Sequence, residues 1–311
     1  MIVPPPRTAN RTPGKPIKKM VRKHPVEIAG DSEISLPTGP NVPSENILDF
    51  NWMIYGTKNI GKSCIAALFD DVADGVHFLA EPGRRDVSSP IVPKRGEVPL
   101  TWERIVDYLE LLRKREKPGR IVLDTLDTIA QLCESHYAKA NGVSTLMALT
   151  DNGRAWRTMT DNFSNTWNTM LWSGWRVTVL SHVRVRDKVT RNIARNDMKK
   201  AKADGIVVPE TQPSCSGWAY EWTKVVCSLV GCFVYRGRDR VLYIRGHEAM
   251  YASPGGGTVG DTHFLDPRTN EPYDAIWMGT SPTQAWANLQ AAWANEVEGI
   301  VVAEQEFYKD G

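Results

Sequence analysis

The sequence lacks the features that place a chain in a membrane or in an oxidising compartment. It has no run of about 18 apolar residues, so we expect no transmembrane helix. The N-terminus has no apolar core of the kind that secretory signal peptides carry. The five cysteines are odd in number and scattered, and none forms a C-x-x-C pair, which argues against a disulfide framework and a zinc site. These absences predict a reduced, cytoplasmic protein without membrane contact.

Acidic residues are missing from the first 26 residues, which contain seven Lys and Arg residues. Because the whole chain has a net charge of +2, the rest of the chain carries −5. A basic arm on a mildly acidic body suits a nucleic-acid partner, but a solubilising tail explains the charge equally well. Residues 1–45 are also rich in proline and glycine and show no hydrophobic period, so we expect a disordered N-terminal extension.

The most informative stretch is residues 56–63, which fits the phosphate-binding P-loop pattern G-x-x-x-x-G-K-[ST]. The two glycines permit backbone angles that turn the loop amides toward a phosphate. Lys62 would reach the outer phosphates, and the Ser63 hydroxyl would hold Mg²⁺. An apolar strand candidate precedes the loop and an apolar helix start follows it. The sequence therefore predicts an ATP site formed by Gly56, Thr57, Lys58, Asn59, Ile60, Gly61, Lys62, Ser63 and Cys64.

Apolar strand candidates alternate with amphipathic helices through the middle of the chain. The strands are expected at residues 51–55, 76–80, 120–124, 176–182, 225–235 and 241–245, and the helices at 102–114, 128–140, 153–172 and 282–297. This order predicts an α/β fold with a RecA-like core, in which a mostly parallel sheet is flanked by helices and ends in an antiparallel hairpin. We expect an ATPase core at residues 46–250 and a C-terminal loop and helix at residues 251–311, packed on or near that core.

Polar residues stand at the ends of three of the other strand candidates. Asp124 comes about 60 residues after Lys62, where a P-loop ATPase places the Walker B carboxylate that holds Mg²⁺. A helix N-cap is the alternative role, although Asp127 suits the cap better. Glu81 could polarise the attacking water as a general base, and the alternative is a surface glutamate without a catalytic role. His182 could contact the γ-phosphate as a sensor, and the alternative is a histidine with a structural role only.

Residues 184–213 are expected to form a polar loop that is too long to be a simple connector. It has an excess of basic residues, namely Arg184, Arg186, Lys188, Arg191, Arg195, Lys199, Lys200 and Lys202. A solvated surface is the usual explanation of such a run. Its place after His182 favours binding to a DNA backbone, without a pattern for reading bases. One of these cations, or Lys224, could instead reach a neighbouring subunit's phosphate as a trans-acting finger.

The motifs G-T-K-N-I-G-K-S, F-L-A-E-P-G, R-I-V-L-D-T-L-D-T-I and V-T-V-L-S-H occur in this order. Together they resemble the phage-encoded RecA-like ATPases of the Sak single-strand-annealing type, often labelled "AAA domain" or "phage nucleotide-binding protein", over about residues 47–246. The resemblance implies an ATP- and Mg²⁺-dependent recombination protein that binds single-stranded DNA and forms a homo-oligomeric ring or filament in a bacterial host cytoplasm. A single-strand-binding protein is a candidate partner.

The resemblance also implies roles for single residues. Lys62 and Ser63 match the phosphate and Mg²⁺ positions, Asp124 the Walker B carboxylate, Glu81 the catalytic glutamate and His182 the sensor. The loops after Asp124 and His182 match the DNA-facing loops. Two features depart from the family: the strand end reads A-E-P-G in place of an acid-rich D-x-E-G, and the basic N-terminal extension is not typical.

Three other functions remain open on the sequence. A helicase or helicase loader and a nucleotide-gated DNA-binding module with little turnover would use the same P-loop. A small-molecule kinase would need a lid and an acceptor pocket, and the sequence locates neither.

Overall fold

The computed structural model describes residues 44–69, 75–81, 87–189, 207–246, 250–255 and 258–301, with the side chains of residues 187–189, 207–209 and 258 excepted. All of them belong to the second of two compact units, Val42–Gly311, the first being Met1–Asn41. The expected disordered extension at 1–45 therefore lies, except for its last two residues, outside the described residues. Within the described part of the chain, no helix is long and apolar enough to cross a membrane.

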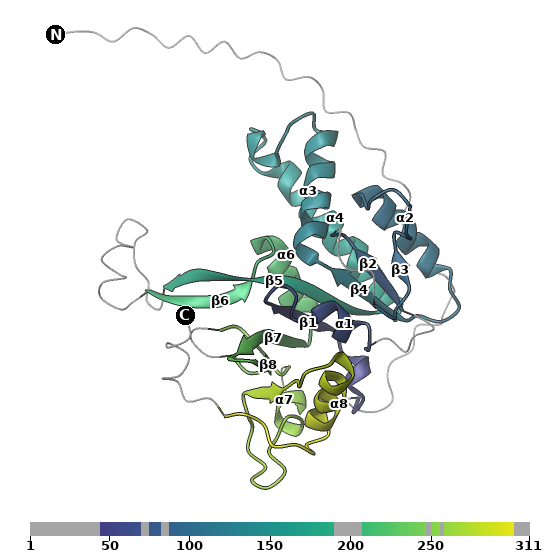
Figure 1. Cartoon of the computed structure of the whole chain (residues 1–311). Coiled ribbons are helices and arrows are strands. Elements are labelled where there is room, and N and C mark those ends of the chain that lie inside the picture. Colours follow the sequence, from purple (N-terminus) through teal and green to yellow (C-terminus); the bar gives the residue numbers. More distant parts are fainter. Residues whose placement is uncertain are drawn as a thin grey trace, which may run out of the picture. The chain divides into compact units, whose positions relative to one another are not determined.

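A mixed β-sheet forms the centre of the described unit (Figure 1). Its strands lie in the order β3 (Ile91–Val92), β2 (Val76–Leu79), β4 (Arg120–Asp124), β5 (Arg176–Val189), β1 (Trp52–Gly56), β7 (Leu229–Arg236), β8 (Asp239–Tyr243) and β9 (Ala275–Trp277). The strands from β3 to β7 pair in parallel, whereas β8 and β9 are antiparallel. This arrangement confirms the predicted α/β class with a C-terminal antiparallel hairpin.

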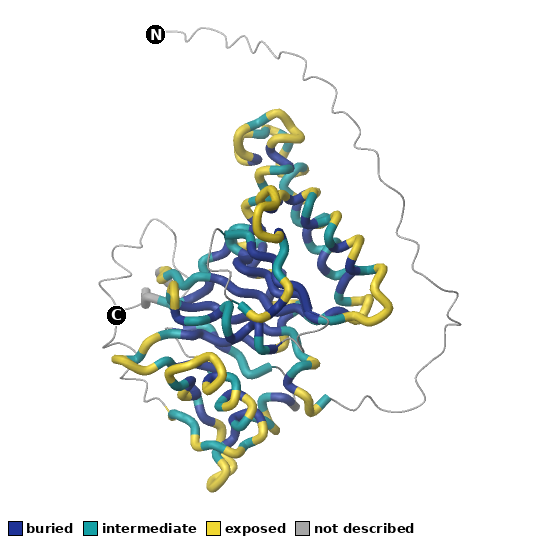
Figure 2. The backbone as a smooth tube through the Cα atoms, turned by 45° about the vertical axis from the view of Figure 1, so that its right-hand side comes forward, coloured by how far each residue is buried: buried dark blue, intermediate teal, exposed yellow. Residues whose placement is uncertain are grey.

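Helices cover both faces of the sheet. One face packs against α2 (Trp102–Arg113), α3 (Leu126–Ala140), α4 (Arg154–Trp172) and α6 (Gly217–Val226). The other face packs against α1 (Lys62–Ala66) and α8 (Pro282–Trp293), with η1 (Ile47–Asp49) and α7 (Thr258–Thr262) nearby. A second 3-10 turn, η2 (Leu146–Ala148), follows α3. Figure 2 shows the strands as the buried layer between these helices.

The two faces follow from the alternation of side chains along each strand. In β1, Met53 and Tyr55 join the cluster under α2, α3 and α4, whereas Trp52 and Ile54 join the cluster under α1 and α8. Because both faces are covered, the strands are apolar nearly throughout, as buried parallel strands are. The aromatic stripe of α4 is core, as its spacing predicts, and Phe163 stacks on Trp102 at a centroid distance of 5.5 Å.

Local signals place the helix ends well. The Thr101 hydroxyl accepts a hydrogen bond from the Arg104 backbone N–H and caps α2, as a threonine before a helix can do. The helix α3 begins at Leu126, two residues earlier than expected. The strand β7 begins at Leu229 and not at Val225, because Val225 still belongs to α6.

The prediction of a polar loop over residues 184–213 is wrong at both ends of that range, where residues 184–189 and 207–213 form strands. The strand β5 continues to Val189 and pairs with β6 (Val207–Pro213) in an antiparallel ladder that runs from Val183–Pro213 to Val189–Val207. Figure 1 shows this hairpin extending beyond the neighbouring strands. Valines at alternating positions favour a strand here, but the charges between them hide the pattern. Residues 190–206 lie outside the described part.

One further expectation needs correction, and two strands are additional to the prediction. The connection directly after Asp124 is the single residue Thr125, because α3 begins at Leu126. The DNA-facing role of the loops after Asp124 stays a prediction. The short strands β3 and β9 do not appear in the sequence-based prediction. They are only two and three residues long, too short for a period-2 pattern to be visible.

Candidate functional site

The P-loop connects β1 to α1 at the carboxyl edge of the parallel strands. Gly61 has a φ of 108° and Asn59 a φ of 64°, so the loop passes through left-handed conformations before the helix begins. The sequence-based prediction explains Gly56 by its backbone angle, whereas the structure explains it by the close approach of β7. A Cβ at position 56 would lie 1.8 Å from the Phe233 carbonyl oxygen, so only glycine lets β1 pass this close to β7.

Lys62 lies folded over the loop that precedes it. Its ammonium donates to the Gly56 and Thr57 carbonyl oxygens, both at 2.9 Å, and the residue is 7% exposed. Burial lowers the pKa of Lys62, and the negative charges of Asp124, Asp127 and Glu81 oppose that change. The cation is therefore held at the mouth of the loop by neutral oxygens, where an anionic phosphate is a stronger partner.

Ser63 and Asp124 meet across the base of the site. The Ser63 hydroxyl donates to Asp124 Oδ2 at 2.6 Å, and Nε2 of His77 lies 3.0 Å from the same oxygen. Burial raises the pKa of Asp124, but the hydrogen bonds from His77 and Ser63 and the charges of His77 and Lys62 outweigh it and lower the pKa overall. The carboxylate is therefore ionised at neutral pH although it is 6% exposed.

This pair of oxygen donors suits Mg²⁺. A hydroxyl and a carboxylate are hard oxygen ligands, and Mg²⁺ in nucleotide sites commonly takes one or two protein oxygens and completes its shell with phosphates and water. No group of three or more His, Cys, Asp and Glu side chains that could hold a metal exists among the described residues, so a protein-only metal cage is not the arrangement found there.

Glu81 and His182 meet at the ends of β2 and β5. Nε2 of His182 lies 3.2 Å from Oε1 of Glu81, and that oxygen also accepts hydrogen bonds from the Thr125 hydroxyl at 2.6 Å and the Thr128 hydroxyl at 3.1 Å. Burial raises the pKa of Glu81, but the bonds from Thr125, His182 and Thr128 lower it by more. Glu81 is thus an ionised, oriented carboxylate, not an isolated surface residue.

Asp127 has a different place from the helix cap expected of it. The N-cap residue of α3 is Thr125, without a side-chain cap bond. The Asp127 carboxylate accepts the His182 backbone N–H at 3.3 Å and a short hydrogen bond from the Ser214 hydroxyl. The Ser214 backbone N–H in turn donates to the His182 carbonyl oxygen at 2.8 Å. Asp127 therefore connects α3 by hydrogen bonds to His182 on β5 and to Ser214 directly after β6.

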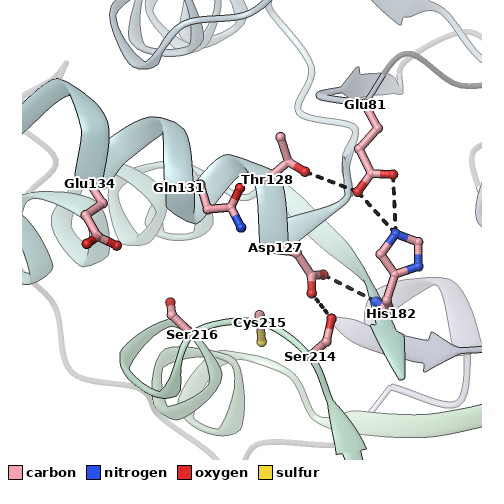
Figure 3. Close-up of a pocket in the computed structure, with 9 residues that line it drawn as sticks. All are labelled: Glu81, Asp127, Thr128, Gln131, Glu134, His182, Ser214, Cys215 and Ser216. Atoms are coloured by element: carbon pink, nitrogen blue, oxygen red, sulfur yellow. Dashed lines mark hydrogen bonds and ion pairs between the residues drawn. The ribbon is translucent and has the colours of Figure 1, made fainter. Parts of the chain in front are cut away.

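A pocket of about 460 Å³ opens beside these residues (Figure 3). It is lined by Glu81, Asp127, Thr128, Gln131, Glu134, His182, Ser214, Cys215 and Ser216. The pocket does not include the P-loop, but His182 and Glu81 form its wall on one side. The register pairs His182 with Gly56, the first residue of the P-loop, so the pocket adjoins the phosphate site.

The predicted DNA-binding residues fall into three groups. Arg184 is turned inward, and its guanidinium donates to the Cys215 carbonyl oxygen at 2.8 Å at the base of the hairpin. Arg186 is exposed. The Lys188 side chain and the residues Arg191, Arg195, Lys199, Lys200 and Lys202 lie outside the described part of the chain.

Lys224, the candidate finger, lies on α6. Its ammonium pairs with Glu221 at 2.8 Å and lies 4.3 Å from the centroid of the Tyr220 ring.

The sequence-based prediction missed His77 and Ser214 in this region and gave Asp127 another role. His77 is a polar residue within the apolar strand V-H-F-L, and that interruption is the signal that could have singled it out. Asp127 and Ser214 carry no such local signal, because their contact joins positions 87 residues apart.

Comparisons with known proteins identify no family for this chain. No protein-family model matches it, and no curated protein does so. Among solved structures, it is similar to the KaiC-like protein PH0186 from the hyperthermophilic archaeon Pyrococcus horikoshii OT3, with 12% identity, a TM-score of 0.38, and coverage of 75% of this chain and 87% of that one. That likeness is too weak to carry an argument, so the fold assignment rests on the sheet order and the P-loop of this chain.

Proposed function

We propose that this protein is a RecA-like P-loop ATPase that binds single-stranded DNA and acts in recombination or strand annealing. One observation supports the proposal above the others. The P-loop, Glu81, Asp124 and His182 come from the ends of four strands of one parallel sheet and lie along one edge. That edge is where open α/β sheets bind their ligands.

Nucleotide binding would use the P-loop and its lysine. The loop amides and Lys62 bind the phosphates, and the ammonium exchanges its bonds to the Gly56 and Thr57 carbonyls for phosphate oxygens. Ser63 and Asp124 hold Mg²⁺ with the nucleotide. When bound, this ion neutralises negative charge on the phosphates during transfer.

Hydrolysis would use Glu81 as the general base. Its lowered pKa keeps it ionised, and hydrogen bonds from Thr125 and Thr128 orient the carboxylate. A base held in this way can take a proton from water as the water attacks the γ-phosphorus atom. His182 lies against the same carboxylate and at the register position of Gly56, so it can respond to whether the γ-phosphate is present.

The β5–β6 hairpin is the proposed DNA-binding element. Its ladder begins at Val183, next to His182. Arg186 and Lys188 belong to β5, and the other basic residues, up to Lys202, lie between β5 and β6 in the sequence. Binding through phosphate contacts would weaken as the salt concentration rises. Assembly into a homo-oligomer of the Sak type, with a single-strand-binding protein as a partner, is the finer form of this proposal and rests on the sequence motifs.

A second candidate is a small-molecule kinase, which one observation favours. The 460 Å³ pocket beside Glu81 and His182 is an acceptor-sized space next to the phosphate site. In a kinase, the carboxylate would take the proton of an acceptor hydroxyl in the pocket, in place of a proton from water.

The fate of the γ-phosphate separates these functions. Purified protein would be incubated with Mg²⁺ and ATP labelled at the γ-position, and inorganic phosphate and ADP would be measured. Release of one phosphate per ADP supports the ATPase. ADP without matching phosphate, when candidate acceptors are supplied, supports the kinase. No turnover with any nucleic acid or acceptor contradicts both and leaves a nucleotide-gated binding module. Unwinding of a duplex would favour a helicase over an annealing protein.

A further inference from the structure

His77 is a buried histidine that the proposed reaction does not yet use. It lies in β2, is 0% exposed, and is on the same face of the sheet as α1. Nε2 lies 3.0 Å from Asp124 Oδ2, and Nδ1 lies 3.3 Å from the Ser89 hydroxyl, itself in a buried residue. A chain of hydrogen bonds thus runs from Ser63 through Asp124 and His77 to Ser89, between positions far apart in the sequence.

We propose that His77 is a positioning residue for the Mg²⁺ site, which acts by holding the Asp124 carboxylate in the orientation that binds the ion. This inference rests on the proposed nucleotide function. It assigns a role to a residue outside the P-loop and outside the Walker B strand.

The geometry of the carboxylate carries the argument. Within the described residues, the hydrogen bonds from His77 and Ser63 both reach Oδ2 of Asp124, and none reaches Oδ1. A carboxylate whose rotation is fixed through one oxygen presents the other in a constant direction. Partners that orient a metal-binding side chain in this way commonly change metal affinity by about 10- to 100-fold when they are removed.

The surroundings of His77 fix the imidazole as well. Both ring nitrogens have a partner within 3.3 Å, and the neighbouring position on β4, Val122, is fully buried. A ring that served only to fill space would not need a polar partner at each nitrogen, and an apolar side chain would suit the site better. The hydrogen bond to Asp124 is therefore the feature to test.

Two conservative variants separate the two ends of the imidazole. In His77→Gln the amide nitrogen can reach the position of Nε2 and still donate to Asp124. In His77→Asn the shorter side chain reaches only the position of Nδ1, toward Ser89. The matched control is His263→Asn, because His263 is half-buried and bonded to the Trp293 carbonyl oxygen, away from the site.

The measurement is the binding of a non-hydrolysable ATP analogue in the full chain as Mg²⁺ or Mn²⁺ is titrated, with Mn²⁺ binding followed by electron paramagnetic resonance. We expect His77→Asn to need about 10-fold more metal or more. His77→Gln and His263→Asn should stay near the wild type, and nucleotide affinity without metal should be the same in all four proteins.

Each other result counts against the inference. Equal metal dependence of His77→Asn and the wild type overturns it, and so does an equal loss in the Asn and Gln variants, since that would reflect packing alone. If His77→Asn does not fold, Ser89→Ala provides the test, because it removes the far partner of the ring. Ser89→Ala should weaken metal binding in the same direction, and no change would overturn the inference. If the wild-type protein bound the nucleotide equally well with and without metal, that result would overturn both the Mg²⁺-dependent function and this inference.

Discussion

The two halves of the candidate site differ in burial. In the chain Ser63–Asp124–His77–Ser89, Ser63 is half-buried, whereas His77 (0% exposed), Ser89 (5%) and Asp124 (6%) lie deep at the base. The group formed by Glu81, His182, Asp127 and Ser214 lies at the edge, where the side chains of Glu81 and His182 are both 32% exposed. The buried half is enclosed by the sheet and α1, whereas the edge half faces a pocket and the base of the hairpin (Figure 3).

This difference in burial suggests separate roles for the two halves of the site. Buried hydrogen-bonded groups keep one geometry, because leaving a buried polar atom without a partner is costly. That property suits the binding of phosphate and Mg²⁺. Groups at an exposed edge can be reached by water, a nucleotide or a moving strand, which suits proton transfer and signalling. The predictions below separate the two halves by mutation, from the largest expected effect to the smallest.

Lys62→Ala should cause the largest loss, because it removes the buried cation that the proposed function assigns to the phosphates. We expect ATP hydrolysis to fall below detection and ATP binding to weaken sharply, measured by phosphate release and by titration with a fluorescent analogue. Lys117→Ala, at an exposed lysine after α2, is the matched control and should have no effect. If Lys62→Ala hydrolysed ATP at the wild-type rate, the P-loop would not be the site of hydrolysis.

Glu81→Gln should affect the edge half alone. The amide cannot take a proton from water, so we expect kcat to fall by about 100- to 10,000-fold while ATP affinity stays close to the wild type. Single-turnover hydrolysis and equilibrium binding measure the two quantities separately. Equal loss of binding and turnover would show that Glu81 supports the fold of the site and does not act on water.

Asp127→Asn should separate the hairpin from the nucleotide site. An amide offers one acceptor oxygen where the carboxylate serves both the His182 N–H and the Ser214 hydroxyl. We expect the stimulation of hydrolysis by single-stranded DNA to fall by about 5- to 150-fold, the usual size of a coupling between sites. Glu134→Gln changes a carboxylate of the same pocket without a hydrogen bond to His182 or Ser214 and serves as the control. Full DNA stimulation in Asp127→Asn would contradict this coupling.

Thr128→Val should give the smallest effect, a shift in pH dependence. As the proposed general base, Glu81 must be ionised, and its pKa lies below the ordinary glutamate value of 4.5 because of hydrogen bonds that include the one from Thr128. The wild-type rate should therefore hold until the pH falls below that value. Removal of the Thr128 hydroxyl raises the pKa of Glu81, so the acid limb of kcat should move to higher pH. An unmoved limb would exclude Glu81 as the titrating base.

Local patterns predict some parts of this molecule and not others. The P-loop, the strand that ends at Asp124 and the cap at Thr101 are visible in the sequence because each depends on neighbouring residues. The contact of His77 with Asp124 spans 47 positions and requires β2 and β4 to be neighbours, which no local pattern specifies. The hairpin strands are hidden for another reason: the charged residues between the valines mask their alternation. The role of Gly56 depends on Phe233, a residue of the distant strand β7.

The rate of ATP hydrolysis with and without single-stranded DNA tests the central claim most directly. If the nucleotide site is coupled to the β5–β6 hairpin, the wild-type protein should release phosphate from Mg²⁺-ATP faster when single-stranded DNA is present. The stimulation should also decline as the salt concentration rises, since phosphate contacts with DNA weaken. A rate that is the same with and without DNA at low salt would contradict the proposed coupling between ATP hydrolysis and DNA binding.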